Sequence, residues 1–385
     1  MKPVIVLHFG ELMLKGKNQS FFIKILIQNI KNFLDKKNYN KIIRKEGKIV
    51  VEIRDALFHP TLVGSLKKLP GISNLAFGYQ TKPDLDQIQK IALQIAKENP
   101  AKTFKIQTSR SYKKFTLNSM EVSKQVGGFV KAQTKMQVNV TTPELLIRVE
   151  IAKDKAYVLG PKINGPGGLP TGSSGKVICM MSGGIDSPVA AYMMMKRGAN
   201  VILFHAQNKT ITQKQTQDKI EKLAAKLSEY QKPIKLYTVP FDQIQKQIIA
   251  NTESSYRMII YRRFMHCLAD EIRKKEKARA LVTGDNLAQV ASQTMENLIL
   301  ISSATDSLIL RPIIGFNKQE TIDLAEKIET YKISIIPYAD CCSYLVAKHP
   351  QTKGKLADVE KFEKNMDIDK LVKEAIENAE VKLFN

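Results

Sequence analysis

Short apolar runs alternate with amphipathic stretches along the second half of the chain. The runs have the length of buried strands, and the stretches between them repeat apolar residues with a helical period. The expected strands are Val177–Met181, Val201–His205, Ile234–Val239, Ala280–Thr283 and Leu308–Pro312. Asp218–Leu227 and Ser255–Lys274 are two of the expected helices. This alternation predicts a parallel, doubly wound α/β sheet, in which ligands bind at the carboxyl ends of the strands.

The first half has a mixed α+β pattern. Strands and helices occur there in two successive sets, which meet near residues 55–60. The first set comprises strands Val4–Phe9 and Lys48–Ile53 with a helix near Phe21–Leu34 between them. The second set comprises helices Leu85–Lys97 and Ser119–Thr134 and strands Thr103–Thr108, Gln137–Val140 and Leu145–Ile151. Two small modules are therefore expected before the α/β domain.

A stretch rich in glycine and proline separates the two halves. Residues 164–175 carry so many of these residues that neither a helix nor a strand can persist there. The expected domains are therefore 1–57, 58–164 and 176–385, with residues 165–175 as the linker. Two or three domains also agree with the length of 385 residues.

The distribution of hydrophobic residues along the chain indicates a cytoplasmic protein. Hydrophobic residues make up 43% of the chain, yet no apolar run approaches the ~18 residues of a membrane span. The first residues lack the apolar region and cleavage site of a secretory signal. We therefore expect no membrane partner.

Basic residues are concentrated before the linker. Residues 1–170 hold 29 Lys and Arg against 12 Asp and Glu, which accounts for +17 of the net charge of +23. Residues 102–135 contain one acid, Glu121, and the bases Lys102, Lys105, Arg110, Lys113, Lys114, Lys124, Lys131 and Lys135. Such a surface attracts a polyanion, and contact with RNA is the interpretation we favour over a solvated Lys-rich face. Tyr112 and Phe115 either stack on bases or belong to the core.

The hexapeptide Ser182–Ser187 reads Ser-Gly-Gly-Ile-Asp-Ser and follows the strand Val177–Met181. Pro188 and Gly198 mark the start and end of a helix behind it. Glycines let backbone N–H groups approach an anion, and the helix N-terminus adds positive potential. The motif therefore predicts a site for the pyrophosphate of a nucleotide, with a plain Gly/Ser turn as the alternative. It is not a Walker A loop, because Gly172–Val177 fails that motif in spacing and last residue.

Ser182–Ser187 resembles the SGGxDS loop of the PP-loop ATP pyrophosphatases, which activate an oxygen by adenylation. Phe104–Arg110, with Ser119–Glu121 and Gln125–Gly128, resembles the THUMP domain, an RNA-binding module of tRNA-modifying enzymes. The start, His8–Asn18, resembles the ferredoxin-like domain of the ThiI enzymes, the tRNA 4-thiouridine synthetases, and Gly165–Pro170 resembles their interdomain segment. The resemblance covers essentially the whole chain. It implies ferredoxin-like, THUMP and PP-loop domains in that order.

The resemblance also implies a set of residues that bind ATP. They are Met180, Met181, Ser182, Gly183, Gly184, Asp186, Ser187, Leu203, Phe204, Arg262, Gly284 and Gln293. Arg262 is preferred over Arg263 by the resemblance alone. Asp186 could position Mg²⁺ or order the loop, or cap the following helix. Lys318 matches a functionally important lysine of the family, where a cation would stabilise charge on the α-phosphate.

Sulfur transfer needs a thiol that carries a sulfane sulfur. Cys342, followed by Cys341 as second choice, matches the family's catalytic cysteine, and Lys348 and His349 could lower its pKa. Cys179 is expected to be packing. Longer members of the family carry the persulfide on a rhodanese domain, which is not found in this sequence. We therefore expect one of two routes: Cys342 carries the persulfide with Cys341 or Cys267 as the resolving thiol, or sulfide or a separate carrier protein delivers the sulfur. An iron–sulfur cluster on Cys267, Cys341 and Cys342 is possible but not favoured, and no other metal site is expected.

These observations predict an enzyme that adenylates a tRNA uridine at O4 with Mg-ATP and replaces the oxygen with sulfur. The expected partners are tRNA, a sulfur donor such as a cysteine desulfurase or sulfide, and, as is usual in the family, a second copy of the chain. Sulfur transfer for thiamine thiazole synthesis is a possible second role. The alternatives are another PP-loop tRNA-modifying enzyme and a non-catalytic RNA-binding protein with a degenerate loop.

Overall fold

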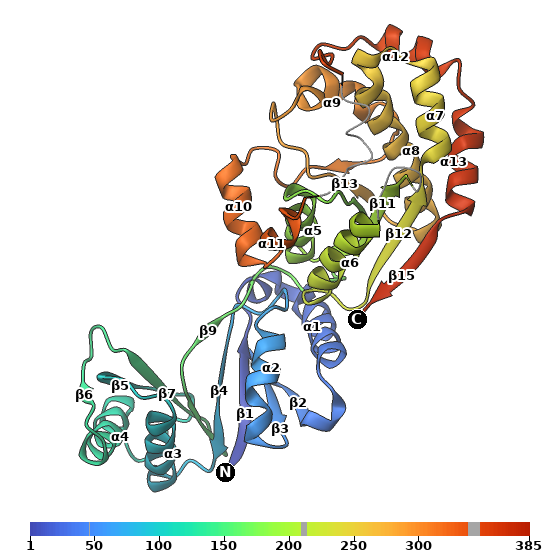
Figure 1. Cartoon of the computed structure of the whole chain (residues 1–385). Helices are drawn as coiled ribbons and strands as arrows, with labels where there is room; N and C mark the ends of the chain where they lie inside the picture. The colour runs from blue at the N-terminus through green and yellow to red at the C-terminus, as the bar shows by residue number, and fades with distance from the viewer. Residues whose placement is uncertain (46, 209–213, 338–346) are drawn as a thin grey trace. The chain divides into compact units, whose positions relative to one another are not determined.

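The computed structural model describes residues 1–45, 47–208, 214–337 and 347–385 (Figure 1). The chain divides between Pro170 and Thr171 into two units, each with its own core. Among the described residues, no helix combines the length and apolar character of a membrane span.

Unit 1, residues 1–170, is built on one sheet. Its strands are β1 (Lys2–His8), β2 (Tyr39–Lys45), β3 (Lys48–Ile53), β4 (Asn74–Thr81), β5 (Thr103–Arg110), β6 (Gln137–Val138), β7 (Leu145–Ile151), β8 (Ala156–Leu159) and β9 (Ile163–Asn164). Its helices are α1 (Gln19–Phe33), α2 (His59–Leu66), α3 (Leu85–Glu98) and α4 (Ser119–Gln133), with 3₁₀ turns at Glu11–Asn18, Lys36–Asn38 and Ala56–Phe58. The strand order is β2-β3-β1-β4-β8-β7-β5-β6, and β9 pairs with β4. Because β4 pairs with β1 on one side and β8 on the other, it joins the two strand sets.

Alternating side chains explain why these strands form. Leu145, Ile147, Val149 and Ile151 of β7 are buried, and the residues between them are half-buried. This period of two turns one face of the sheet toward α3 and α4, whose apolar residues complete that core. A second core contains residues of β1, β3, α1 and α2.

Unit 2, residues 171–385, is a six-stranded sheet within the described residues. Its strands are β10 (Lys176–Met180), β11 (Asn200–Gln207), β12 (Ile234–Pro240), β13 (Ala280–Val282), β14 (Ile309–Leu310) and β15 (Glu380–Phe384). Its helices are α5 (Asp186–Lys196), α6 (Lys214–Ser228), α7 (Asp242–Asn251), α8 (Arg257–Glu276), α9 (Met295–Ser302), α10 (Lys318–Lys327), α11 (Tyr331–Ser334), α12 (Leu356–Glu363) and α13 (Ile368–Glu377), with 3₁₀ turns at Ser254–Tyr256 and Ala291–Gln293. The strand order is β14-β13-β10-β11-β12-β15.

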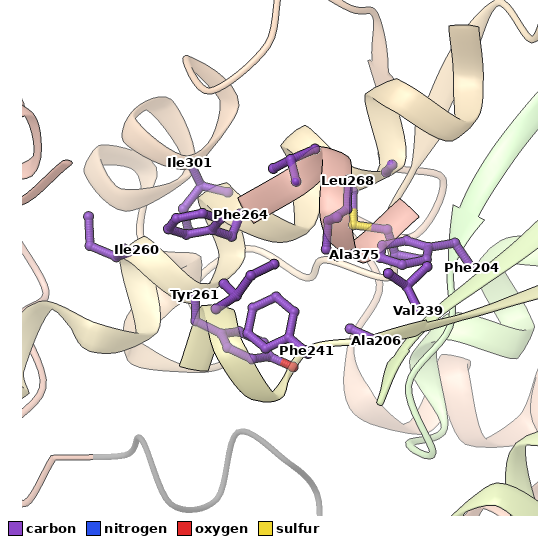
Figure 2. Close-up of a cluster of buried hydrophobic side chains, with 14 of the residues drawn as sticks. Phe204, Ala206, Val239, Phe241, Ile260, Tyr261, Phe264, Leu268, Ile301 and Ala375 are labelled. Carbon is purple, nitrogen blue, oxygen red and sulfur yellow. The ribbon is translucent and has the colours of Figure 1, made fainter. Parts of the chain in front are cut away.

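The predicted doubly wound α/β fold is confirmed. β10, β11, β12, β13 and β14 are parallel, and cores lie on both faces of the sheet. One core packs Phe204 of β11 and Phe241 against Tyr261 and Phe264 of α8 (Figure 2). The other contains the alternate strand residues together with α5 and α6. Strands buried on both faces explain the continuous apolar runs of the sequence.

One strand departs from the expected all-parallel sheet. β15 pairs with β12 in the antiparallel direction at the edge of the sheet. Its residues are mostly exposed, including Val381 and Leu383. Because an exposed strand lacks the apolar run of the buried strands, the sequence pattern gave no prediction for it.

Candidate active site

A cleft of about 340 Å³ opens at the carboxyl ends of the parallel strands in unit 2. The central strand β10 has β11 on one side and β13 on the other, so the connections after β10 and β13 run to opposite sides. This is the point in a doubly wound sheet where ligands bind. Residues 181–187, which follow β10, and residues 283–293, which follow β13, contribute to its walls.

Two serines close the Ser182–Ser187 loop onto itself. The amide of Ser182 donates to Ser187 Oγ at 3.0 Å, and that hydroxyl donates to the Ser182 carbonyl at 3.1 Å. The amide of Gly184 donates to Ser182 Oγ at 3.2 Å. α5 begins directly behind the loop, and the first N–H groups of a helix have no acceptor within it. The loop is therefore a rigid turn that can present backbone donors to an anion.

Gly284 allows the loop after β13 to approach the start of α5. A Cβ on Gly284 would lie 2.9 Å from both the carbonyl carbon of Asp186 and the amide nitrogen of Ser187. The family resemblance placed this glycine among the residues that bind ATP. The structure gives it a definite role within the protein, since any side chain here would push the helix N-terminus away.

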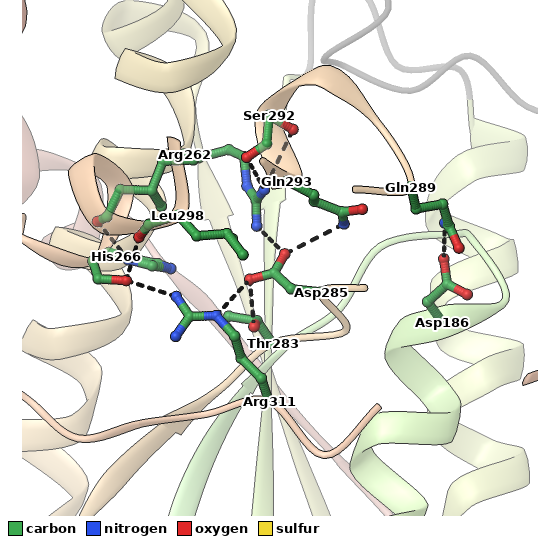
Figure 3. A network of polar contacts seen from close by, with 12 residues as sticks. Asp186, Arg262, His266, Thr283, Asp285, Gln289, Ser292, Gln293, Leu298 and Arg311 are labelled. Carbon is green, nitrogen blue, oxygen red and sulfur yellow. Dashed lines mark hydrogen bonds and ion pairs between the residues drawn. The ribbon is translucent and has the colours of Figure 1, made fainter. Parts of the chain in front are cut away.

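The carboxylate of Asp186 is held from two directions. The side-chain amide of Gln289 donates to its Oδ2 at 3.1 Å (Figure 3). Lys318 Nζ lies 3.0 Å from its Oδ1. The N-cap of α5 is Ile185, without a side-chain cap, so Asp186 does not act as the N-cap. Its side chain is 21% exposed and lines the cleft. The carboxylate is therefore available for a ligand beside a cation.

A capping box fixes the position of Lys318 at the start of α10. The side chain of Asn317 accepts from the amide of Glu320 at 2.9 Å, and Glu320 accepts from the amide of Asn317 at 2.7 Å. This reciprocal pair sets where the helix begins. Lys318 is therefore its first residue.

A buried ionic network forms the wall across the cleft. Asp285 is 2% exposed, accepts from Thr283 Oγ1 at 2.7 Å, and pairs with Arg262 and with Arg311, whose Nε lies 3.2 Å away (Figure 3). Gln293 donates to the same carboxylate at 3.4 Å. Two guanidinium groups share one carboxylate, so the network carries an excess positive charge on the side of the cleft that Arg262 lines.

Opposing effects set the protonation of this network. Burial alone would raise the pKa of Asp285, but Arg262, Thr283 and Arg311 outweigh it and lower the pKa to about 2. Burial, reinforced by Arg262, lowers the pKa of His266 to about 4. Asp285 is therefore ionised and His266 neutral at neutral pH. His266 Nδ1 lies 3.0 Å from the Ile301 carbonyl.

The structure gathers most of the expected ATP-binding residues around this cleft. The lining includes Met180, Met181, Ser182, Asp186, Ser187, Arg262, Gly284 and Gln293. Gly183 and Gly184 belong to the loop between them. The side chains of Leu203 and Phe204 are fully buried in the two cores, whereas His205 and Ala206, which follow them, line the cleft.

The structure also distinguishes Arg262 from its neighbour. Arg263 forms a two-pronged pair with Glu363, at 2.7 and 2.8 Å, and is 7% exposed. Only Arg262 of the two lines the cleft.

Sequence reasoning missed Asp285, Gln289 and Arg311. Asp285 and Gln289 follow β13, and Arg311 follows β14, so their places at strand ends offered a signal that was not used.

The two cysteines expected to carry sulfur, Cys341 and Cys342, lie outside the described residues. The chain leads toward them from Ile336, whose carbonyl accepts from the buried Lys219 at 2.8 Å. Lys348 and His349, beyond them, are exposed. Among the described residues, no group of three or more His, Cys, Asp or Glu side chains could hold a metal ion.

The other two cysteines are unsuited to act as thiolates. Burial raises the pKa of Cys179 to about 12, and its side chain packs in a core as expected. Burial and Glu363 raise the pKa of Cys267 to about 11, and its Sγ lies 3.6 Å from the Ala304 carbonyl. Cys267 is therefore a poor resolving thiol at neutral pH.

The bases of residues 102–135 lie on the part of unit 1 built from β5, α4 and their connections, and all of them except Lys135 are the residues predicted to bind RNA. Of these predicted residues, five are exposed: Lys102, Lys113, Lys114, Lys124 and Lys131. Lys105 and Arg110 are half-buried, and they donate to the carbonyls of Val140 at 2.7 Å and Phe115 at 3.0 Å. Phe115 packs against the core.

Arg110 lies at a larger basic cleft of about 560 Å³ in the same unit. Five bases line it, namely Lys45, Lys48, Arg110, Lys153 and Lys155, against the acids Glu150 and Asp154. Lys48 pairs with Glu150 and lies over the ring of Tyr157 at 4.6 Å. The positive charge of unit 1 thus extends from β5 to β2 and β3.

Fold and site together define a nucleotide-binding enzyme domain of the PP-loop class joined to a basic α+β unit. Family models agree with this division: the ThiI ferredoxin-like domain matches residues 4–76, the THUMP domain residues 82–159, and the thiamine biosynthesis protein (ThiI) family residues 172–368. The chain belongs to the ThiI family of tRNA sulfurtransferases, which confirms the resemblance seen in the sequence.

Relatives match the chain from end to end. A probable tRNA sulfurtransferase of Thermoanaerobacter sp. (strain X514) is 42% identical over 373 residues, 97% of each chain. One from Moorella thermoacetica is 38% identical over 382 residues, covering 99% of this chain and 97% of the relative. Among solved structures, a 4-thiouridine synthetase–RNA complex with bound ATP matches with a TM-score of 0.92 at 30% identity over all of both chains. PH1313 from Pyrococcus horikoshii, 22% identical with a TM-score of 0.65, covers 85% of this chain and 99% of that one and shares the fold.

Proposed function

We propose that this protein is an ATP-dependent tRNA sulfurtransferase that converts a uridine to 4-thiouridine. The observation that carries the proposal is the cleft at the strand ends, which residues of the Ser182–Ser187 loop and Arg262 line and where Lys318 pairs with Asp186. The matching 4-thiouridine synthetase, solved with RNA and ATP, supports both substrates.

ATP binds with its phosphates against the loop. The backbone donors at the start of α5, with Lys318 and Arg262, surround the negative charge of the phosphates. Mg²⁺ in nucleotide sites is held by one or two carboxylates together with phosphates, and the exposed carboxylate of Asp186 meets that requirement. Asp285 does not meet this requirement, because its carboxylate is already paired with Arg262 and Arg311. When bound, Mg²⁺ neutralises phosphate charge.

The first chemical step activates the base. Uracil O4 attacks the α-phosphorus of ATP, the new O4–P bond forms, and the bond to the β-phosphate breaks as pyrophosphate leaves. Lys318, fixed as the first residue of α10, stabilises the negative charge that develops on the α-phosphate. Because the target base must reach this cleft, it leaves its stack in the RNA.

The second step transfers sulfur. The terminal sulfur of a Cys342 persulfide attacks C4, and AMP leaves with the former O4. The thiolate of Cys341 then attacks the sulfur of Cys342, which releases 4-thiouridine and leaves a Cys341–Cys342 disulfide for an external thiol to reduce. Cys341 is the better resolving thiol because the thiol of Cys267 is protonated at neutral pH. A cysteine desulfurase supplies this sulfur by transfer of its own persulfide sulfur to the Cys342 thiolate. Sulfide supplies it by attack on Cys342 Sγ in the Cys341–Cys342 disulfide, which breaks the S–S bond, releases the Cys341 thiolate and leaves the persulfide on Cys342.

Unit 1 binds the tRNA. Its exposed lysines contact phosphates, so affinity falls steeply with salt. As members of this family are usually homodimers, we include a second copy of the chain in the proposal. Sulfur transfer for thiamine thiazole synthesis is a secondary part of the proposal.

A thiolation assay tests the proposed function. Unmodified tRNA, Mg-ATP and sulfide, or a cysteine desulfurase with cysteine, are incubated with the protein, and 4-thiouridine is measured by its absorbance after nuclease digestion. We expect 4-thiouridine together with AMP and pyrophosphate. Failure to form any thiolated nucleoside with either donor would contradict the proposal.

Two cysteine variants then separate the two steps. Cys342→Ser should abolish thiolation while tRNA-dependent release of pyrophosphate continues. Cys179→Ser, at a buried packing position, is a control that keeps the chemistry intact if it folds. If Cys342→Ser still forms 4-thiouridine, the role given to Cys342 is wrong.

A further inference from the structure

We infer that Gln289 is a positioning residue that orients the carboxylate of Asp186 for the adenylation step. This inference rests on the proposed function and assigns a role to a side chain beyond the residues predicted for the site. Its basis is the contact of the Gln289 side-chain amide with Asp186 Oδ2 at 3.1 Å (Figure 3). Lys318 makes its shorter contact, 3.0 Å, with the other oxygen, Oδ1.

Hydrogen bonds join the segment that carries Gln289 to the segment that carries Lys318. The amide of Leu287 donates to the Ile314 carbonyl at 3.0 Å. The side chain of Asn286 donates to the Phe316 carbonyl at 2.6 Å. Residues 286–289 and 314–318 therefore form one connected support, which delivers a cation and an amide donor to the same carboxylate.

The backbone beside Gln289 is in an unusual conformation. Ala288 has φ +59°, in the left-handed region that side chains other than those of Gly, Asn and Asp rarely adopt. Its amide donates to the Gln293 carbonyl at 2.9 Å, and the Gln293 amide donates to the Val290 carbonyl at 2.8 Å. Ala288 is exposed, so packing of its methyl group does not explain this conformation. The turn directs the next residue, Gln289, toward the start of α5.

This geometry restricts what Asp186 can do. Lys318 lies 3.0 Å from Oδ1 and 3.3 Å from Oδ2, so it restrains the carboxylate through a single atom at the end of a flexible side chain. The amide of Gln289 adds a second, separate donor on Oδ2. Gln289 therefore holds the plane of the Asp186 carboxylate in one orientation toward the cleft. When the amide is removed, the carboxylate is no longer held in that orientation during the reaction.

Removal of the amide tests the inference. Gln289→Ala should lower kcat of tRNA-dependent pyrophosphate release about tenfold, because the free energy of one hydrogen bond to a charged group corresponds to a factor of about this size. The KM for tRNA should change little. Ala288→Gly relieves the left-handed strain and keeps Gln289 in place, so it should retain parent activity. Ala288→Val disfavours the turn and should reproduce the loss of Gln289→Ala.

A variant of the same length distinguishes orientation from a structural effect. Gln289→Met keeps the length of the side chain but has no donor for Asp186 Oδ2. It should therefore lose as much kcat as Gln289→Ala, with the same small change in KM for tRNA.

The outcomes separate this inference from the proposed function. If the parent protein shows no tRNA-dependent pyrophosphate release, the proposed function has failed. If the parent is active and both Gln289→Ala and Gln289→Met match its kcat, only the role of Gln289 is overturned. Binding of a fluorescent ATP analogue, measured for each variant, should change less than threefold. A loss of binding as large as the loss of kcat would make Gln289 a ligand contact and would also overturn the inference.

Discussion

Asp285 in unit 2 is 2% exposed and lies between two arginines, whereas Lys113, Lys114, Lys124 and Lys131 in unit 1 point into solvent. Both regions concentrate positive charge, and both are expected to meet phosphate. In unit 2 each charge has fixed partners, so the site depends on geometry. In unit 1 the charges are exposed and numerous, so binding depends on their density. The two regions should respond differently to substitution.

The largest effect is expected for Asp285→Asn. The substitution removes the carboxylate that Arg262 and Arg311 share, and the loss of one partner from a buried ion pair costs about 3–5 kcal/mol. Hydrogen exchange of α8 and β13 should become faster while exchange of unit 1 stays the same. Lys113→Ala is the matched surface control and should change neither unit. Unchanged protection in Asp285→Asn would mean that the network does not stabilise unit 2.

Acid should destabilise unit 2 in two stages. As the pH is lowered from 6.5 to about 4, the unfolded chain binds a proton at His266 and the folded chain does not. The free energy of unfolding therefore decreases by about 3 kcal/mol over this range. Between pH 3.8 and about 2, Asp285 adds a further loss of about 2 kcal/mol, because its folded pKa is the lower one. Thermal unfolding of the parent and of His266→Gln at pH 7 and 5 measures the first stage. An identical pH dependence in both would exclude His266 as its cause.

Gly284→Ala should impair the site with a smaller effect on the fold. The added Cβ would lie 2.9 Å from the backbone at Asp186 and Ser187, so the helix start must move. We expect pyrophosphate release to fall roughly tenfold to a hundredfold, since a misplacement of about 1 Å has that effect. At Gly64, in α2, a Cβ would meet no atom within 4 Å, which makes Gly64→Ala the control. Equal activity of the two variants would remove the argument for this close approach.

The smallest effect is expected for single lysines of unit 1. Lys113→Ala should weaken tRNA binding about threefold to tenfold and lower the slope of log affinity against log salt by about 1. Lys105 already donates to the Val140 carbonyl, so Lys105→Ala should change the slope less. Filter binding at several salt concentrations measures both. A larger change for Lys105 than for Lys113 would contradict the assignment of the exposed surface.

The sequence predicted the parts of the fold that have buried, regular patterns. β7 was predicted with the correct bounds because its apolar residues alternate, and β10 to β13 were found from apolar runs. β15 was missed because its side chains are exposed at the sheet edge. β4 was missed although it is largely buried and central to unit 1.

The site was predicted where a local motif exists. Ser182–Ser187 and Gly284 stand directly after strands, and Lys318 came from the family resemblance. Asp285, Gln289 and Arg311 could not be assigned, because their roles arise from contacts between segments distant in the chain. The hydrogen bonds between residues 286–289 and 314–318, for example, produce no pattern that a single sequence would reveal.

The transfer of oxygen from RNA to AMP tests the central claim most directly. A tRNA transcript carrying ¹⁸O at uracil O4 is incubated with the protein, Mg-ATP and a sulfur donor, and the AMP is analysed by mass spectrometry. Attack of O4 on the α-phosphate predicts that each 4-thiouridine formed releases one AMP carrying ¹⁸O. Unlabelled AMP, formed while thiolation proceeds, would contradict adenylation of the uridine.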